Sequence, residues 1–273
     1  MPTTLEEVVS IEVAADERVR GTFVAPGTLM PGVLFVHGWG GSQEQYLARA
    51  RAVASLGCVC LAFDLRGHAE NRPQFGTVSR STNLRDVEAA YDRLVARRYV
   101  DRNAIAVIGS SYGGYLASIL TTMRPVRWLG LRAPALYMDS GWELPKLQLR
   151  KEQDLVTYRS SLVPAETNRA LRACQAFDGD MLLIESEFDE TIPAAVLASY
   201  RQAATRTRSL TFRCIKGADH GLTSEDSQRA YTTVLLGWLK EMVSGARVGQ
   251  VPAAAPETAA QPETPPQTIR EDG

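Results

Sequence analysis

Residues 109–113, Gly-Ser-Ser-Tyr-Gly, match the pattern G-x-S-x-G with Ser111 at its centre. The stretch before them is apolar, as in a strand, and the stretch after them has the composition of a helix. A sharp strand-to-helix turn lifts a serine hydroxyl clear of the sheet and directs it toward the helix N-terminus. We therefore expect Ser111 to be a nucleophile, whereas Ser110 does not hold the central position. The alternative is a glycine-rich turn whose serine has no chemical role.

A nucleophilic serine needs a base, and the chain has only three histidines, His37, His68 and His220. In hydrolases with this turn, the nucleophile comes first along the chain, the acid second and the histidine last. Only His220 follows Ser111, in a loop after the last predicted strand, where side chains reach the carboxyl edge of the sheet. His220 is the predicted base, and a loop histidine held by backbone groups is the alternative. His68 is expected to brace a turn.

The third member of such a site orients the imidazole and stabilises its cation. Asp189 follows an apolar run that predicts a strand, and it is the predicted acid. Glu187 is an alternative with a different side-chain direction, and Glu185 is expected to lie within the end of the strand. Asp219 is adjacent to His220 and would have to fold back on its neighbour.

Acyl transfer also requires two backbone N–H groups for the developing oxyanion. One is expected from Tyr112, directly after the nucleophile. The other is expected from Trp39 in the loop 37–41, H-G-W-G-G, whose glycines let the backbone curl back toward Ser111. No G-K-[ST] follows this loop, so it does not match a phosphate-binding loop. The alternative is an ordinary glycine-rich connection between a strand and a helix.

The elements that must position these residues alternate between strand-like and helix-like stretches. Apolar or alternating runs predict strands over residues 8–13, 19–25, 32–37, 58–63, 105–108, 128–131, 181–185 and 211–215, and helical periodicity predicts helices over 84–95, 112–124 and 230–242. Another helix is expected to start with Ser42 as N-cap and Gln45 completing a capping box. After an antiparallel start, the β-α-β alternation predicts a doubly wound, mostly parallel sheet with helices on both faces.

Residues 134–177 lie between two predicted strands and are too many for a plain loop. Leu155 and Leu171 indicate short helices, so the segment is predicted to form a small helical cap over the carboxyl edge of the sheet. The cap would bring Tyr137 and Trp142 to the mouth of the site as substrate-binding residues. The alternative is that these aromatic side chains pack the cap onto the sheet.

Residues 245–273 differ from the rest of the chain, because they hold five prolines, many Ala, Glu, Thr and Gln, and no aromatic residue. Such a segment buries too little apolar surface to offset the entropy lost on ordering it. We therefore expect one catalytic domain over residues 1–244 and a disordered tail over residues 245–273.

Composition excludes several classes of function. The 273 residues carry a formal net charge of −1, without the basic excess of a protein that binds nucleic acid or an anionic membrane. No apolar run is long enough for a transmembrane helix, and the N-terminus does not resemble a secretory signal. The four cysteines form no C-x-x-C pair, so we expect buried, reduced thiols in a cytoplasmic protein and no metal site.

Five motifs in this order resemble the α/β-hydrolase family over residues 8–243. They are H-G-x-G-G at 37–41, F-D-x-R-G-H at 63–68, G-x-S-Y-G-G at 109–114, F-D-x-x-x-P at 188–193 and A-D-H-G at 218–221. The S-Y-G-G sequence and the short cap resemble the dienelactone-hydrolase and prolyl-oligopeptidase branches. Residues 69–71 and Glu185 depart from the common pattern, since many relatives carry glycine at the latter position. The resemblance implies an α/β-hydrolase fold.

Together these features predict a cofactor-free serine hydrolase that cleaves carboxylic esters with a short acyl chain through an acyl-enzyme. Its partner would be a small-molecule acyl compound. A peptidase or amidase of prolyl-oligopeptidase type is an alternative, although such relatives usually carry a large additional domain that we do not expect here. A thioesterase or C–C hydrolase is another. A non-catalytic binding protein on the same fold is the third, although a binder would not need Ser111, Asp189 and His220 together.

Overall fold

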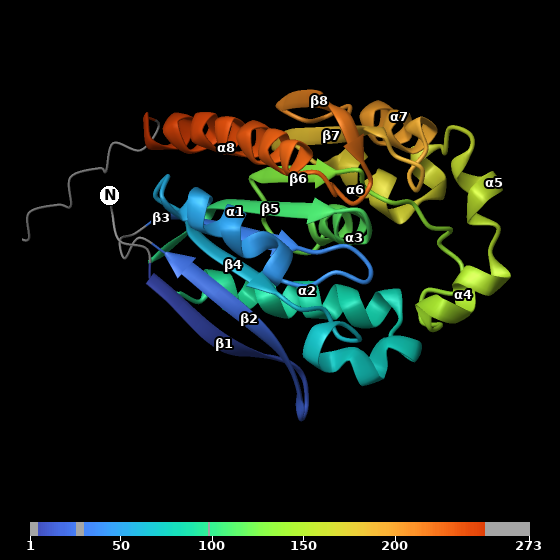
Figure 1. Cartoon of the computed structure of the whole chain (residues 1–273), viewed down its shortest axis with the longest axis horizontal. Helices are drawn as coiled ribbons and strands as arrows, with labels where there is room; N and C mark the ends of the chain where they lie inside the picture. The colour runs from blue at the N-terminus through green and yellow to red at the C-terminus, as the bar shows by residue number, and fades with distance from the viewer. Residues whose placement is uncertain (1–4, 26–29, 98, 249–273) are drawn as a thin grey trace, which may run out of the picture.

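The computed structural model describes residues 5–25, 30–97 and 99–248, which form an eight-stranded sheet flanked by helices (Figure 1). The strands are β1 (Leu5–Ala14), β2 (Glu17–Ala25), β3 (Met30–Val36), β4 (Val59–Phe63), β5 (Val100–Ser110), β6 (Trp128–Arg132), β7 (Asp180–Phe188) and β8 (Ser209–Asp219). Their order across the sheet is β1-β2-β4-β3-β5-β6-β7-β8. The β1/β2 and β2/β4 pairs are antiparallel and all others are parallel. The predicted mostly parallel sheet is confirmed.

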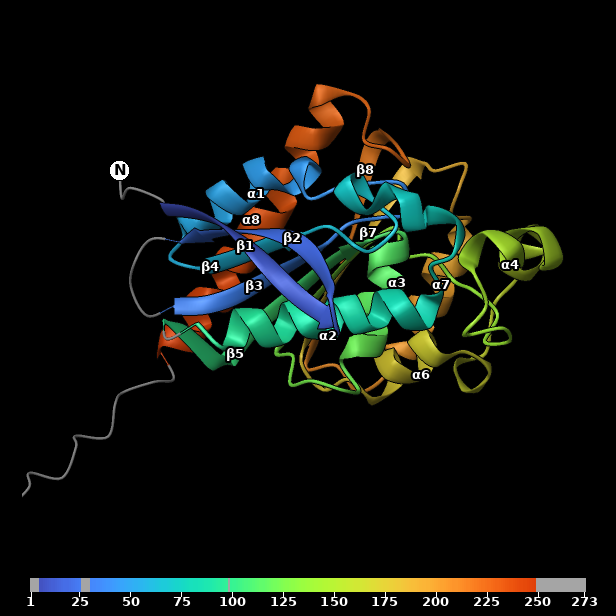
Figure 2. The same cartoon turned by 90° about the horizontal axis from the view of Figure 1, so that it is seen from below.

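Helices cover both faces of the sheet (Figure 2). They are α1 (Glu44–Ala54), α2 (Arg80–Val95), α3 (Tyr112–Leu120), α4 (Lys146–Glu152), α5 (Leu155–Arg159), α6 (Arg169–Ala176), α7 (Ala194–Ala203) and α8 (Glu225–Val248), with 3₁₀ segments η1 (Ala69–Gly76) and η2 (Ala165–Thr167). Helices α1 and α8 pack on one face, and α2, α3 and α6 pack on the other. This doubly wound architecture agrees with the sequence prediction, in which α7 has no counterpart. Within the described residues, no helix combines the length and the apolar character needed to cross a membrane.

The central strands are buried on both faces, which explains their continuous apolar sequence. In β3, Leu34 and Val36 belong to the core on one face, while Val33 and Phe35 belong to the core on the other. A strand buried on one face only would alternate apolar and polar residues instead. The two cores hold the parallel strands in register, so their carboxyl ends meet at one edge of the sheet.

The start of α1 differs from the sequence prediction. The helix begins at Glu44, and its N-cap is Gln43, whose side chain makes no capping hydrogen bond. The buried Gln43 amide instead donates from Nε2 to Asp64 Oδ2 at 2.9 Å, and its Oε1 accepts from the Thr22 hydroxyl at 2.7 Å. The capping box predicted at Ser42 is wrong, because contacts to β2 and to the end of β4 determine where α1 begins.

Beyond the carboxyl edge of the sheet, the chain forms an irregular stretch that includes α4, α5 and η2 (Figure 1). We call residues 133–168, between β6 and α6, the edge segment. Helix α6 also falls within the cap predicted over residues 134–177. However, it packs against α3 with Leu171 and Cys174 buried in the core. It therefore belongs to the layer that covers the sheet and not to the stretch over its edge.

Two other expectations differ from the structure. Helix α8 continues to Val248, past the boundary expected at residue 244, and residues 249–273 of the predicted tail lie outside the described residues. Cys58, Cys60 and Cys174 are buried, as expected, but Cys214 is exposed. Cys214 lies on β8, the edge strand of the sheet, where Arg213 and Lys216 are exposed as well.

Candidate active site

Ser111 occupies the sharp turn between β5 and α3, with φ 51° and ψ −117°. A positive φ is strained for a residue with a Cβ and persists only where the surrounding structure imposes it. The backbone of Ser111 is held on both sides: its N–H donates to the Arg132 carbonyl at 2.9 Å, and its carbonyl accepts from Ala135 at 3.0 Å and from Tyr115 at 3.1 Å. The turn predicted from the sequence is therefore present and firmly fixed.

The two glycines of the motif allow this turn to pack tightly. A Cβ on Gly109 would lie 2.4 Å from the Gly113 carbonyl oxygen. A Cβ on Gly113 would lie 2.2 Å from the carbonyl oxygen of Val36, at the end of β3. No real Cβ approaches another atom so closely, so the start of α3 can rest against β3 only because these positions lack side chains.

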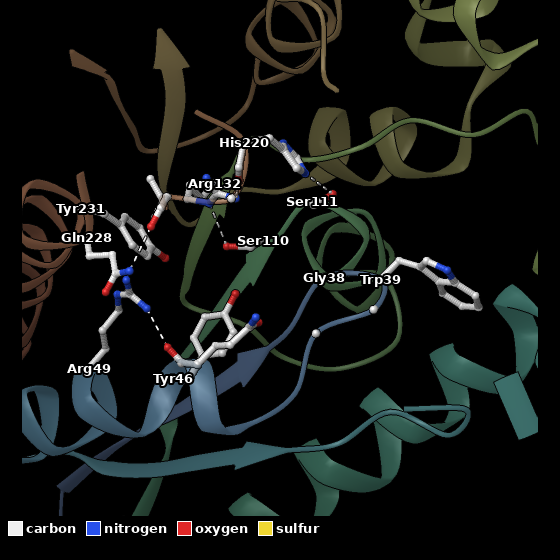
Figure 3. A pocket seen from close by; sticks show the side chains of 15 residues that line it. Gly38, Trp39, Tyr46, Arg49, Ser110, Ser111, Arg132, His220, Gln228 and Tyr231 are labelled. Carbon is white, nitrogen blue, oxygen red and sulfur yellow. Dashed lines mark hydrogen bonds between the residues drawn. The ribbon is translucent and has the colours of Figure 1, made fainter. Parts of the chain in front are cut away.

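His220 follows β8 and lies beside Ser111 (Figure 3). Its Nε2 is 3.1 Å from Ser111 Oγ, and its Nδ1 is 2.7 Å from Asp189 Oδ2. Asp189 itself follows β7. Because β5, β7 and β8 are parallel, residues directly after their carboxyl ends meet at one edge, although they are far apart in the sequence. The three side chains named from the sequence thus form a continuous chain of hydrogen bonds.

The Asp189 carboxylate is well prepared to remain ionised. Its Oδ1 accepts hydrogen bonds from the backbone N–H of Ile192 at 2.8 Å and of Thr191 at 2.9 Å, while Oδ2 faces His220. Burial acts to raise the pKa of Asp189, but the hydrogen bonds from His220 and from the two backbone N–H groups outweigh it, so the pKa is lowered. An ionised carboxylate here can orient the imidazole and stabilise its cation.

The alternative acids are engaged elsewhere. Glu187 is exposed and binds Lys216 Nζ at 2.8 Å and the Gly217 N–H at 2.8 Å. The Asp219 carboxylate accepts from the backbone N–H and the hydroxyl of Thr223, each at 2.8 Å. Glu185 lies inside β7, as predicted. Among the described residues, no three His, Cys, Asp or Glu side chains are grouped so that they could hold a metal ion.

The other two histidines have structural partners. In the buried His37, Nε2 accepts from the Leu65 N–H at 3.0 Å and Nδ1 lies 2.8 Å from the Gly38 carbonyl oxygen. The His68 ring packs edge-on against Trp39, with the ring centroids 4.7 Å apart. Burial lowers the pKa of both histidines to about 4. Each therefore serves as a neutral packing group at neutral pH.

The loop 37–41 lies directly against the nucleophile turn. A Cβ on Gly38 would meet Ser111 Cβ at 3.4 Å. The Trp39 and Tyr112 rings also contact each other, with centroids 5.4 Å apart. Tyr112 opens α3, and the first N–H groups of a helix have no partner within it. The loop that holds Trp39 and the first residue of α3, Tyr112, thus both lie next to Ser111, and their N–H groups remain the predicted donors.

Two cavities meet at the Ser111–His220 pair, and both residues line each of them together with Trp39. One cavity, of about 340 Å³, extends toward α1 and α8 and includes Tyr46, Arg49, Arg132 and Tyr231 (Figure 3). The other, of about 280 Å³, lies under the edge segment and includes Tyr137, Lys146 and Arg159. We call this second one the edge cavity. Each has room for a small organic group only.

The two aromatic residues predicted to bind substrate lie in different places. Tyr137 lines the edge cavity, next to the reactive pair. Trp142 does not: it lies in a separate surface depression with Leu84. The guanidinium groups of Arg169 and Arg80 hold it there, 4.6 and 5.4 Å from its ring centroid. Trp142 thus lies outside the residues that line the two cavities at Ser111, and its cation–π contacts with Arg80 and Arg169 account for this position; its role in substrate binding stays a prediction.

Sequence reasoning missed two cationic residues of the site. Arg132 is buried and donates to Ser110 Oγ and Ser186 Oγ, each at 3.2 Å, and to the carbonyl oxygen of His220 at 2.6 Å. Lys146 is buried in the edge cavity. A charged residue directly after the apolar run at 128–131 is the signal that could have drawn attention to Arg132.

Comparison with known families identifies the family of the chain. A model of the prolyl oligopeptidase family matches residues 44–246 of the chain. The chain belongs to the prolyl oligopeptidase family. The matched range includes Ser111, Asp189 and His220. A curated relative of this family member, an uncharacterized protein of Mycobacterium tuberculosis found in two strains, is 35% identical over 192 residues. That match spans 70% of the chain but only 63% of the relative.

Solved structures show the fold that this prolyl oligopeptidase family member shares. A Pyrococcus furiosus esterase matches with a TM-score of 0.67 and 17% identity, over 88% of this chain and 92% of that chain. A Pyrococcus horikoshii acylaminoacyl peptidase matches with a TM-score of 0.68 and 16% identity, over 89% of this chain and 42% of that chain. The chain has the α/β-hydrolase fold.

Proposed function

We propose that the chain hydrolyses small carboxylic esters through a triad of Ser111, His220 and Asp189 and a covalent acyl-enzyme. The observation that carries this proposal is the unbroken contact from the serine to the acid. His220 Nε2 lies 3.1 Å from Ser111 Oγ, and its Nδ1 lies 2.7 Å from Asp189 Oδ2. With Nδ1 protonated and bound to the carboxylate, Nε2 is free to accept the serine proton.

In the first half of the reaction, Ser111 Oγ attacks the ester carbonyl carbon while His220 Nε2 takes its proton. The carbonyl oxygen becomes an oxyanion, which the backbone N–H groups of Tyr112 and Trp39 stabilise. Asp189 stabilises the imidazolium that forms. The tetrahedral intermediate then breaks its bond to the alcohol oxygen, which leaves with the proton from His220 and yields an ester between the acyl group and Ser111.

In the second half, a water molecule takes the place of the alcohol. His220 Nε2 removes one of its protons as the water oxygen attacks the acyl carbon, and the same two N–H groups stabilise the second oxyanion. The intermediate breaks its bond to Ser111 Oγ, which recovers its proton from His220. The products are the carboxylic acid and the unchanged enzyme.

A peptidase is the second candidate. It is favoured by the family to which the chain belongs and by the fold shared with an acylaminoacyl peptidase. An ester is favoured by the small volumes of the two cavities, about 280 and 340 Å³, which suit short groups on either side of the scissile bond. An alkoxide also leaves more readily than an amine, so the ester places fewer demands on the proton delivered by His220.

The two candidates are separated by comparing kcat/KM for p-nitrophenyl acetate, an acetyl thioester and an aminoacyl p-nitroanilide. The proposal predicts the highest value for the oxygen ester. Ser111→Ala should lower it by about 10³-fold or more. Ser110→Ala keeps the nucleophile and should lower kcat/KM for the oxygen ester far less. A higher kcat/KM for the anilide would favour the peptidase, and full ester hydrolysis by Ser111→Ala would contradict the proposed nucleophile.

A further inference from the structure

The edge cavity carries an unbalanced positive charge. Four of its lining residues are cationic: Arg80, Lys146, Arg150 and Arg159. None of the residues described as lining it is an aspartate or a glutamate. Burying charges without counter-charges is costly, and proteins usually pair them. Arg80 and Lys146 are buried, so their unpaired positive charge beside the reactive serine needs an explanation.

Lys146 lies next to the residues that adjoin Ser111. It opens α4 and its side chain is buried. The Nζ atom lies 4.0 Å from the ring centroid of Trp39, 4.9 Å from that of Tyr112 and 5.0 Å from that of Tyr137. These rings hold the ammonium group over the cavity, next to the residue that follows Ser111.

Within the part of the chain that the structure describes, Arg80 and Arg159 are bound only by neutral groups. The fully buried Arg80 donates to the backbone carbonyl oxygens of Met138 and Ser140. Arg159 donates from Nε to the Leu136 carbonyl oxygen at 2.8 Å. Carbonyl oxygens orient these guanidinium groups but do not neutralise them, so both keep their full positive charge beside the cavity.

Two acids of this region, Asp139 and Asp189, are engaged with other groups. Asp139 binds Arg172 at 3.0 Å, on the outer side of the edge segment. Asp189 is hydrogen-bonded to His220. Among the ion pairs of the described residues, none includes Lys146 or another cation of the cavity. Burial lowers the pKa of Lys146, as expected where no carboxylate compensates it.

We infer that the edge cavity binds a carboxylate of the substrate, so that the enzyme prefers esters which carry a negative charge a few bonds from the scissile carbonyl. This inference rests on the proposed ester hydrolysis. Lys146 would bind the carboxylate directly, and Arg80 and Arg159 would add to the attraction. A volume of about 280 Å³ accommodates a short dicarboxylic chain but not a long one. The bound anion supplies the missing counter-charge.

Two pairs of substrates test the preference on the unaltered enzyme. Mono-(4-nitrophenyl) glutarate carries the carboxylate on the acyl side, and its methyl ester is the neutral control. The corresponding pair with the charge on the leaving group is 4-acetoxybenzoate and methyl 4-acetoxybenzoate. In at least one pair, kcat/KM should be about 10-fold or more higher for the anion, as expected for a charge-assisted contact. Equal or higher values for both methyl esters would overturn the inference.

A matched pair of lysine variants on the same helix tests the residue. Lys146→Met removes the ammonium group but keeps an unbranched chain, whereas Lys151→Met does the same at an exposed position. Lys146→Met should lower kcat/KM, mainly through KM, by a factor about 10- to 100-fold greater for the anionic substrate than for its methyl ester. Lys151→Met should leave kcat/KM unchanged for both substrates. Equal losses for the anion and its methyl ester in Lys146→Met would contradict an anion site.

The results also distinguish this inference from the function on which it rests. If the neutral methyl esters are hydrolysed in a Ser111-dependent manner without any preference for the anions, the esterase proposal stands and the anion site is wrong. If no ester is hydrolysed, the proposed function fails. Glutarate should also slow the labelling of Ser111 by a fluorophosphonate in wild type but not in Lys146→Met. Equal labelling rates in wild type with and without glutarate would contradict the site independently of any substrate.

Discussion

Arg132 donates a hydrogen bond of 2.6 Å from its guanidinium to the carbonyl oxygen of His220, and its own carbonyl accepts one of 2.9 Å from the N–H of Ser111. A single residue at the end of β6 thus connects the loop of the proposed base to the turn of the proposed nucleophile. The remaining donors of the buried guanidinium are directed at the hydroxyls of Ser110 and Ser186. The relative position of serine and histidine therefore depends on this arginine.

Replacing Arg132 by methionine should impair catalysis without removing a reacting group. We expect Arg132→Met to lower kcat for p-nitrophenyl acetate by about 10- to 100-fold, because small displacements of a reacting group are costly, with a smaller change in KM. Arg213→Met, at an exposed position on β8, is the control and should keep its activity. Circular dichroism shows whether both variants are folded. An unchanged kcat in Arg132→Met would contradict the positioning role.

The assignment of the acid is tested by a pair of isosteric variants. Asp189→Asn should lower kcat by about 10²- to 10⁴-fold, because an asparagine no longer stabilises the imidazolium or its productive tautomer. Glu187→Gln removes an exposed ion pair with Lys216 and should leave kcat within about twofold of the wild type. The two variants are compared by steady-state ester hydrolysis. The reverse pattern would show that Glu187 is the acid.

Replacing Gly113 in the nucleophile turn and Gly237 in α8 by alanine should change the free energy of unfolding in opposite directions. Gly113→Ala should lower the free energy of unfolding by about 3 kcal/mol or more, because its Cβ would lie 2.2 Å from the Val36 carbonyl oxygen. Gly237→Ala, in the exposed part of α8 with no atom within 4 Å of the added Cβ, should raise it by about 0.5–1 kcal/mol. Urea unfolding followed by circular dichroism measures both. A Gly113→Ala variant as stable as the wild type would refute the packing argument.

Buried His37 makes the stability depend on pH. Its pKa is lowered from 6.5 to about 4 by burial, so between these pH values the unfolded chain binds a proton that the folded chain does not. The contribution of His37 is fully present above pH 6.5 and is lost as the pH falls toward 4, at a slope of at most about 1.4 kcal/mol per pH unit. In urea titrations at pH 7, 6 and 5, the free energy of unfolding should fall less steeply with decreasing pH in His37→Gln than in the wild type. If the free energy of unfolding depended on pH equally in both proteins, His37 would bind its proton as readily in the folded chain as in the unfolded chain.

The positions of Ser111, Asp189 and His220 could be anticipated because each directly follows a strand. The apolar runs that predict β5, β7 and β8 are clear, and parallel strands carry the residues after them to one edge whatever their distance in the sequence. The small number of histidines then left one base after the serine. Their spatial proximity follows from topology, and their catalytic roles stay a proposal.

Side chains in irregular segments could not be placed in this way. Trp142 and Lys146 both belong to the edge segment, whose helices are too short to show a periodicity. Trp142 packs against Arg80 and Arg169 and does not line the edge cavity. Lys146 packs against the Trp39 ring and does line it. The start of α1 also differs from the prediction, because contacts with distant strands determine it and neighbouring residues do not.

Covalent labelling shows whether His220 activates Ser111 as a nucleophile. The wild type, Ser111→Ala and His220→Gln are treated with a fluorophosphonate, and the modified residue is located by peptide mass spectrometry. We expect one label, on Ser111, that is absent in Ser111→Ala and forms at least about 10²-fold more slowly in His220→Gln. A label on Ser110, or an equal labelling rate in His220→Gln, would contradict it.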